Sequence, residues 1–176
     1  KIAVATTKAY SAQVALLSLI ALNLSYKKDL TNKSEIKEIL SDAKKLPDYI
    51  QELLNRTYDY KRIAEEIKDQ NDIFFIGRGV DYALAEEGSL KLKEISYTHS
   101  EAYAAGELKH GTISLIEDKT PVVAIITDEK IAPKTISNVK EVKSRGADVI
   151  CITSFDYLGE DICDEKIVIP KVNYLF

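Results

Sequence analysis

The residues with the clearest chemical potential are a lysine and a glutamate spaced three apart, Lys91 and Glu94. The apolar pattern around them predicts a helix over residues 82–97, so their side chains share one helix face, with Glu87 one turn earlier. A carboxylate at the C-terminal edge of a sheet can remove a proton beside a carbonyl, because a neighbouring ammonium group stabilises the developing enolate. Judged by spacing alone, however, such a pair is more commonly a solvated helix face.

A histidine with possible acid-base chemistry follows in the polar segment Ser100–Gly111, which we predict to be a loop. His110 lies near the end of this segment, together with two carboxylates and between two glycines. Such a histidine can exchange protons near neutral pH, although a simple surface histidine fits the same pattern. His99 has no comparable context, and we predict a structural role for it.

Two turns could hold a ligand. Gly77-Arg78-Gly79 follows the apolar run 73–76, where a strand-to-helix turn can present backbone amides to an anion. Gly88 is too distant to complete a dinucleotide fingerprint, and the glycines could equally serve only the turn. Val4–Lys8 places backbone donors and hydroxyls ahead of a helix, which suits sugar hydroxyls or an anion, or merely a helix cap.

The elements that position these residues alternate along the chain. Strands and helices at this rhythm predict an α/β fold with a doubly wound parallel sheet and helices on both faces. The 11–24 helix is apolar on most of its surface, so we expect burial on more than one side. We predict helices over 11–24, 32–54 (capped by Ser34 and interrupted at Pro47), 58–69, 82–97 and 132–145, strands over 73–76, 121–127, 149–153 and 166–169, and a further helix beginning at 172–176.

Composition excludes several classes of function. The net charge is -4 with no basic stripe, so no nucleic acid partner is expected. The apolar run 14–24 is interrupted and too short to cross a bilayer, so no membrane span is expected. Cys151 and Cys163 lack a metal-ligand or disulfide pattern and are expected to be small buried side chains in a reducing cytoplasm. No metal and no cofactor is expected, and a chain that begins at Lys1 without methionine suggests a fragment.

Four segments in one order resemble a known family: 4–10, 77–79, 87–97 and 101–111. Together they are similar to the isomerase domain of the glutamine:fructose-6-phosphate aminotransferase (isomerising) family, also called glucosamine-6-phosphate synthase. The resemblance implies an SIS-type three-layer α/β fold, a parallel sheet flanked by helices and preceded by a helical arm. Residues 1–56 would be the end of a first SIS subdomain and a helical connector. Residues 57–176 would be a second SIS subdomain, truncated at its C-terminus.

The resemblance also implies roles for individual residues. The carboxylate matching Glu94 moves a proton between C1 and C2 of the open-chain sugar, and the lysine matching Lys91 supports the developing charge. The histidine matching His110 assists ring opening and reaches into the active site of the neighbouring subunit. The substrate-binding residues implied are Val4, Ala5 and Thr6, with Thr6 standing where the family has a serine.

The expected protein is therefore a cytoplasmic homodimer that converts fructose 6-phosphate and ammonia into glucosamine 6-phosphate, with a glutaminase domain of the full-length chain as ammonia source. The family's phosphate loop and imine-forming lysine lie outside these 176 residues, so this piece alone is expected to be inactive. The alternatives within the same resemblance are an SIS-family fructosamine-phosphate deglycase or sugar-phosphate isomerase, or a non-catalytic module that binds a sugar phosphate.

Overall fold

A computed structural model describes residues 4–173 of the chain, which divides into two compact units. One unit comprises Lys1–Arg56 with Lys171–Phe176, and the other comprises Thr57–Pro170. The first unit contains two helices, α1 (Thr7–Lys27) and α2 (Lys33–Leu54), which contact one another. Leu22 of α1 is buried, as are Ile36 and Ile39 of α2. These side chains form the small apolar seam of the helical unit.

Helix α1 differs from the sequence-based expectation in two respects. Among the described residues of α1 only Leu22 is buried within this chain, so the chain by itself does not cover the helix on several sides, and packing inside an assembly stays a prediction. The helix has 21 residues and, by length and composition alone, could cross a membrane, so the run 14–24 underestimated the length of this segment. A core helix of a soluble protein passes the same test of length and composition. The large apolar side chains exposed on α1 include Val14, Leu16, Leu17, Leu19, Ile20 and Leu24.

Helix α2 is capped and continued differently from the prediction. Its N-cap is Asn32, whose Oδ1 accepts a hydrogen bond from the Ser34 amide at 3.0 Å, and Ser34 itself lies inside the helix. Pro47 was expected to interrupt the helix, yet α2 runs through it to Leu54. Proline removes one backbone donor, and the other hydrogen bonds of this 22-residue helix let it continue past Pro47.

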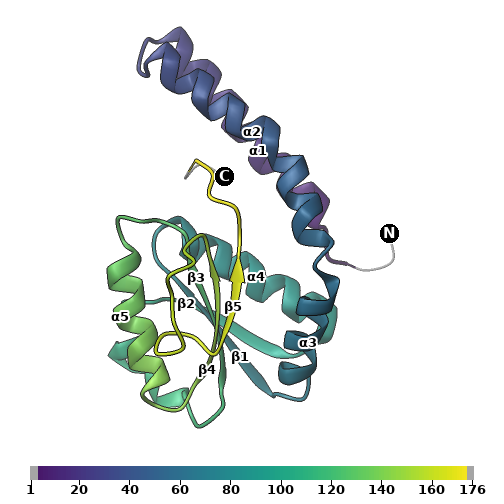
Figure 1. The fold of residues 1–176 in the computed structure, drawn as a ribbon, viewed down its shortest axis with the longest axis vertical. Coiled ribbons are helices and arrows are strands. Elements are labelled where there is room, and N and C mark those ends of the chain that lie inside the picture. The colour runs from purple at the N-terminus through teal and green to yellow at the C-terminus, as the bar shows by residue number, and fades with distance from the viewer. Residues whose placement is uncertain (1–3, 174–176) are drawn as a thin grey trace. The chain divides into compact units, whose positions relative to one another are not determined.

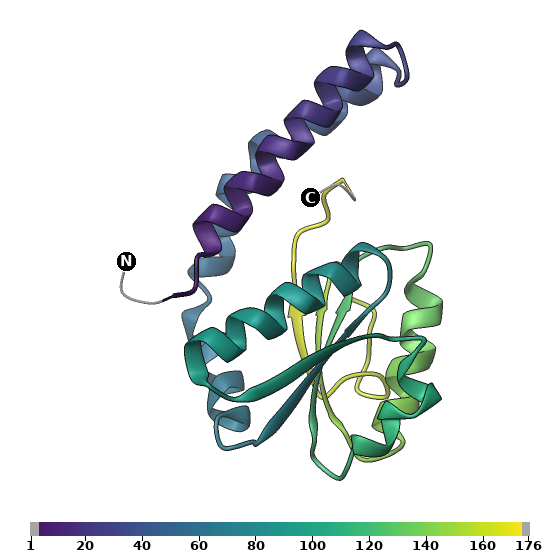
Figure 2. The ribbon, with the colours of Figure 1, turned by 180° about the vertical axis from the view of Figure 1, so that it is seen from behind.

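The second unit is the predicted α/β fold, a parallel sheet with helices on both faces (Figures 1 and 2). Among residues 4–173 five strands form one sheet in the order β2-β1-β3-β4-β5, and every pairing is parallel. Its elements are α3 (Thr57–Ile67), β1 (Asp72–Gly77), α4 (Val80–Ser96), β2 (His99–Ala104), the 3-10 helices η1 (Leu108–His110) and η2 (Thr112–Leu115), β3 (Pro121–Ile126), α5 (Ala132–Lys143), β4 (Asp148–Thr153) and β5 (Glu165–Val168).

Alternation along the strands divides the core between two faces of the sheet. Phe74 and Ile76 of β1 belong to a cluster that includes Val139 and Val142 of α5. The intervening Ile73 and Phe75 pack instead with Ile63 of α3 and Ala85 of α4. The sheet is therefore covered by α5 on one face and by α3 and α4 on the other, as Figure 1 shows.

Strand β2 was not predicted, because its residues were assigned to a polar loop. It pairs with β1 over its whole length, from Asp72 opposite His99 to Gly77 opposite Ala104. As an edge strand it needs few β-branched residues, and its small and polar side chains hid the signal. The helix expected at 172–176 is not seen at residues 172–173, and residues 174–176 lie outside the described part.

Candidate active site

The contact predicted between Lys91 and Glu94 is present on α4. The ammonium nitrogen of Lys91 lies 2.7 Å from Glu94 Oε2 and 3.5 Å from Glu87 Oε1. The side chains of Lys91 and Glu94 are only 17% and 22% exposed, so this is not a fully solvated helix face. Hydrogen bonding to Glu94, with the charges of Glu87 and Glu94, raises the pKa of Lys91. We call Glu87, Lys91 and Glu94 the α4 triad.

The N-terminus of α4 is fixed to the end of β3 by Asp81. This carboxylate is 2% exposed and accepts hydrogen bonds from the Thr127 amide, at 2.9 Å, and from the Thr127 hydroxyl. Gly79 precedes the helix with a φ of 59°, which glycine adopts without strain. Asp81 therefore fixes the first turn of α4 to the end of β3, and an anion bound at the preceding turn stays a prediction.

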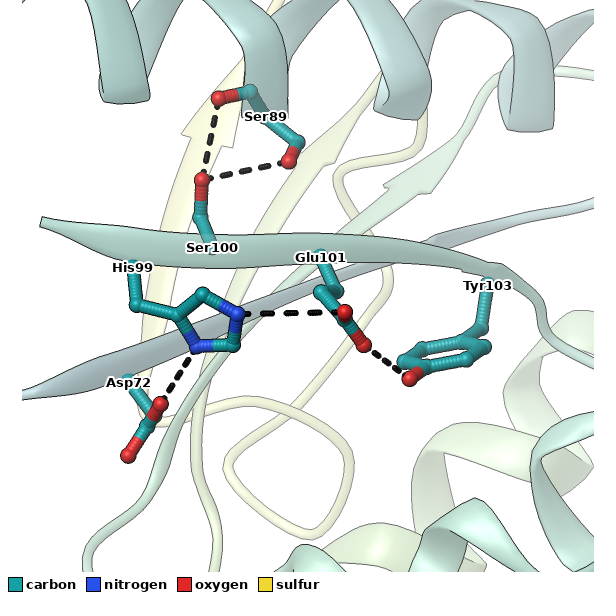
Figure 3. A network of polar contacts seen from close by, with 6 residues as sticks. All are labelled: Asp72, Ser89, His99, Ser100, Glu101 and Tyr103. Carbon is teal, nitrogen blue, oxygen red and sulfur yellow. Dashed lines mark hydrogen bonds and ion pairs between the residues drawn. The ribbon is translucent and has the colours of Figure 1, made fainter.

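The middle of α4 is fixed to β2 by a buried pair of serines, Ser89 and Ser100 (Figure 3). The Ser100 hydroxyl donates to the Ser89 carbonyl at 2.9 Å, and the two hydroxyl oxygens lie 3.1 Å apart. Because the Ser100 proton is used in the first bond, Ser89 is the donor in the second. Both serines are fully satisfied, and they hold the helix in one register only five residues before Glu94.

The α4 triad lies at the opposite edge of the sheet from the one predicted. Helix α4 begins just after β1 ends, and it ends at Ser96, shortly before β2 starts at His99. Since β1 and β2 are parallel, the helix must run back along the sheet, and its last turn lies where the strands begin. Glu94 is therefore at the N-terminal edge of the strands, and the expected position at the C-terminal edge was wrong.

His110 follows the other end of β2, in η1. It lies in a shallow pocket of 510 Å³, and its side chain makes no hydrogen bond or ion pair with any residue of 4–173. The six-residue strand between the two edges is about 20 Å long, so His110 and Glu94 of one chain do not meet. The residues lining the pocket are Tyr103, Glu107, His110, Gly111, Thr112, Ser114 and Leu115.

The three predicted sugar-binding residues belong to the helical unit. Val4, Ala5 and Thr6 lead directly into α1, and Val4 is exposed. Thr6 occupies the N-cap position without a capping hydrogen bond from its side chain. Their role therefore stays a prediction from the resemblance.

A second polar network lies on the face of β2 opposite Ser100 (Figure 3). His99 Nδ1 lies 2.6 Å from Asp72 Oδ1, and its Nε2 lies 3.8 Å from Glu101. Glu101 accepts a hydrogen bond from the Tyr103 hydroxyl, which raises the pKa of Tyr103 to about 12. These contacts join neighbouring strands at a largely exposed edge, in line with the structural role predicted for His99.

Sequence reasoning missed two groups that shape the site. The serine pair could have been found from the alternation of small residues in β2, had the segment been recognised as a strand. Arg78 was considered only as part of a turn, yet its guanidinium group donates to Asn138 Oδ1 on α5. Its long-range partner leaves no signal in the local sequence.

Comparison with known proteins agrees with the fold and the motifs. The SIS domain family matches residues 66–163, more than half of the chain. A glutamine–fructose-6-phosphate aminotransferase (isomerizing) from Caldanaerobacter subterraneus subsp. tengcongensis is 49% identical over 97% of this chain and 28% of its own length. The enzyme of the same name from Clostridium tetani is 46% identical over 100% of this chain and 29% of its own length.

A solved structure extends the similarity to three dimensions. The C-terminal domain of glucosamine-fructose-6-phosphate aminotransferase from Francisella tularensis superposes with a TM-score of 0.93 at 31% sequence identity. The superposition covers 99% of this chain and 50% of that chain. The sequence therefore spans less than a third of the length of the curated relatives it matches and half of this solved domain.

Proposed function

Because the chain belongs to the SIS domain family, we propose that it is part of the isomerase half of a glutamine:fructose-6-phosphate aminotransferase. The complete enzyme would make glucosamine 6-phosphate from fructose 6-phosphate and glutamine-derived ammonia. The observation that carries this proposal is the half-buried contact of 2.7 Å between Lys91 and Glu94. Their helix is fixed to the sheet by hydrogen bonds between two buried serines. The names of relatives with 46% and 49% identity support the same activity.

In the proposed reaction the ketose opens, ammonia adds at C2 with loss of water, and a proton moves from C1 to C2. Glu94 is suited to carry that proton, because a carboxylate can accept it at one carbon and return it at the next. Lys91 lies 2.7 Å from this carboxylate and can stabilise the negative charge that develops when C1 is deprotonated. Glu87 keeps the ammonium group in place from the other side, at 3.5 Å.

His110 is proposed to act on the sugar bound by a second copy of the chain, where it assists ring opening. Its place at the edge opposite Glu94 supports this division, since one chain alone does not bring the two groups together. Its unpartnered side chain among the described residues leaves both ring nitrogens available to a substrate. The proposal therefore requires a homodimer.

The remaining assignments are proposals from the resemblance. Val4, Ala5 and Thr6 would line the sugar pocket, and a glutaminase domain elsewhere in the complete chain would supply ammonia. We propose that the enzyme is cytoplasmic and that α1 packs inside the protein, where its exposed apolar side chains would be covered, and does not lie in a membrane. The polar residues that interrupt α1, among them Ser18 and Asn23, support packing inside a protein.

A coupled assay of glucosamine 6-phosphate formation from fructose 6-phosphate and ammonia tests the proposal. The 176-residue chain alone is expected to show no turnover, whereas the complete enzyme that contains it should be active. Turnover by the isolated chain would contradict the proposed need for further segments. An inactive complete enzyme that still binds fructose 6-phosphate would favour a non-catalytic module.

A further inference from the structure

Arg78 is the one side chain of the Gly77-Arg78-Gly79 turn that crosses to another element. Its Nε and one terminal nitrogen donate to Asn138 Oδ1 at 3.1 and 2.9 Å. Asn138 lies on α5 and is only 5% exposed, so the acceptor is fixed inside the unit. Arg78 therefore joins the end of β1 to α5 across the C-terminal edge of the sheet.

The guanidinium group of Arg78 also covers Gly106, the second residue of the segment 105–111, which we call the His110 loop. A Cβ atom added at Gly106 would lie 2.5 Å from one terminal nitrogen of Arg78 and 3.0 Å from its Cζ. Glycine permits this close approach, whereas a side chain at this position would displace the guanidinium group, the flexible end of Arg78. The amide of Ala105 donates to the carbonyl of Gly77 at 2.8 Å, so the loop is also hydrogen-bonded to the residue that precedes Arg78.

The position of Gly106 is transmitted to His110 over a short, hydrogen-bonded path. The Glu107 amide donates to the Ala104 carbonyl at 2.8 Å, and the His110 amide donates to the Glu107 carbonyl at 3.0 Å. Between them, Leu108 is buried in the core at 2% exposure. Because the His110 side chain has no partner among residues 4–173, its orientation depends on this backbone.

The hydrogen-bond acceptor of Arg78 indicates that this side chain fixes the positions of its neighbours. Within the described residues no carboxylate forms an ion pair with Arg78, and its acceptor is the neutral amide of Asn138. That amide in turn donates to Glu141 Oε2 at 3.4 Å, which orients its oxygen toward Arg78. Two nitrogens on one oxygen hold the plane of the guanidinium group, which a lysine could not do.

We propose that Arg78 is a positioning residue that holds the His110 loop through Gly106 and Asn138. The geometric part stands on the contacts above, and its catalytic consequence rests on the proposed function. If Arg78 acts in this way, disturbing Gly106, Arg78 or Asn138 should move His110 in the same direction. Substitutions elsewhere on α5 should leave His110 unchanged.

The first test uses NMR of the 176-residue chain, whose two histidines give two imidazole cross-peaks. Gly106→Ala and Arg78→Ala should each shift the His110 cross-peak, while that of His99 stays in place. In the double variant Gly106→Ala/Arg78→Ala the shift should equal that of Arg78→Ala alone, because the added methyl group then has no guanidinium group to displace. Additive shifts, or an unmoved His110 signal, would overturn the proposal.

The second test measures kcat and KM for fructose 6-phosphate in the complete enzyme. Arg78→Ala and Asn138→Leu should lower kcat about tenfold with little change in KM, because a misplaced catalytic group slows the reaction without weakening substrate binding. Asn138→Asp/Glu141→Gln keeps the acceptor oxygen and a hydrogen bond between positions 138 and 141, and should retain most activity. Lys140→Met, which removes the α5 ion pair of 2.8 Å with Asp161, is the matched control and should behave like the wild type.

The two tests separate the possible failures. A raised KM with unchanged kcat in Arg78→Ala would make Arg78 a substrate contact and overturn the positioning role. Equal losses in Asn138→Leu and Asn138→Asp/Glu141→Gln would also overturn it, because the acceptor oxygen would then be irrelevant. An inactive wild-type enzyme would refute the proposed function, while the NMR result would still decide whether Arg78 positions His110.

Discussion

The α4 triad and the His110 loop are organised in opposite ways. Lys91 is held between two carboxylates of its own helix, and a buried serine pair fixes that helix to the sheet. His110 lies in an open pocket without a side-chain partner among residues 4–173, on a loop held by Arg78. The first region is preorganised by its own chain, whereas the second offers a free group to a molecule outside it. Under the proposed function, these two regions are half-sites that face different surroundings.

Removing the Glu94 carboxylate from the α4 triad should have the largest effect on activity. Glu94→Gln keeps the shape of the side chain and loses the base, so kcat of the complete enzyme should fall by about a thousandfold. KM for fructose 6-phosphate should change little, because the amide can still contact the sugar. Steady-state kinetics measure both, and Glu86→Gln on another face of α4 is the control. Comparable losses in the two variants would show that position 94 has no special role.

Removing the serine pair that fixes α4 to β2 should have an intermediate effect, which is seen in the stability of the chain. Ser100→Ala leaves Ser89 without its buried acceptor and should lower the free energy of unfolding by about 1–2 kcal/mol. In Ser89→Ala/Ser100→Ala no hydroxyl remains to be satisfied, so most of that loss should be recovered. Urea unfolding of the 176-residue chain measures both values. Simple addition of the two single effects would mean that the serines do not act as a pair.

The smallest expected effect is the pH dependence of the stability that the Lys91 ammonium group contributes. Its pKa is raised above the ordinary 10.5 by Glu94 and Glu87, so its contribution to stability is fully present below pH 10.5 and is lost as the pH rises through the higher, folded value. The difference in unfolding free energy between wild type and Lys91→Gln should therefore be constant from pH 6 to pH 9. Urea titrations at several pH values measure it. A difference that changed near neutral pH would show that another group titrates in the α4 triad.

Local patterns predicted most of the fold. The sequence predicted three strands from their apolar runs, β1, β3 and β4, and three helices from their apolar periodicity, α3, α4 and α5. In each of them the burial pattern is visible in the element's own residues. Strand β2 was not, since an edge strand of small and polar residues derives its order from the neighbouring β1. Pro47 was misjudged because a proline removes a single backbone donor, and a helix of 22 residues can continue without it.

The site was predicted only where contacts are local. The Lys91–Glu94 contact follows from helical spacing and is present. The prediction that Glu94 lies at the C-terminal edge of the sheet was wrong. Because β2 was not recognised, nothing in the sequence showed that α4 must return to the start of the next strand. The contact of Arg78 with Gly106 joins residues 28 apart and exists only in the folded unit.

The central claim of the proposed function is that Glu94 and His110 act together only across two copies of the chain. Complete-enzyme variants Glu94→Gln and His110→Asn, carried on different affinity tags, can be co-expressed and the doubly tagged heterodimer purified. Each parent homodimer should be inactive, while the heterodimer contains one intact site and should show about half of the wild-type activity. A heterodimer as inactive as its parents would contradict the account.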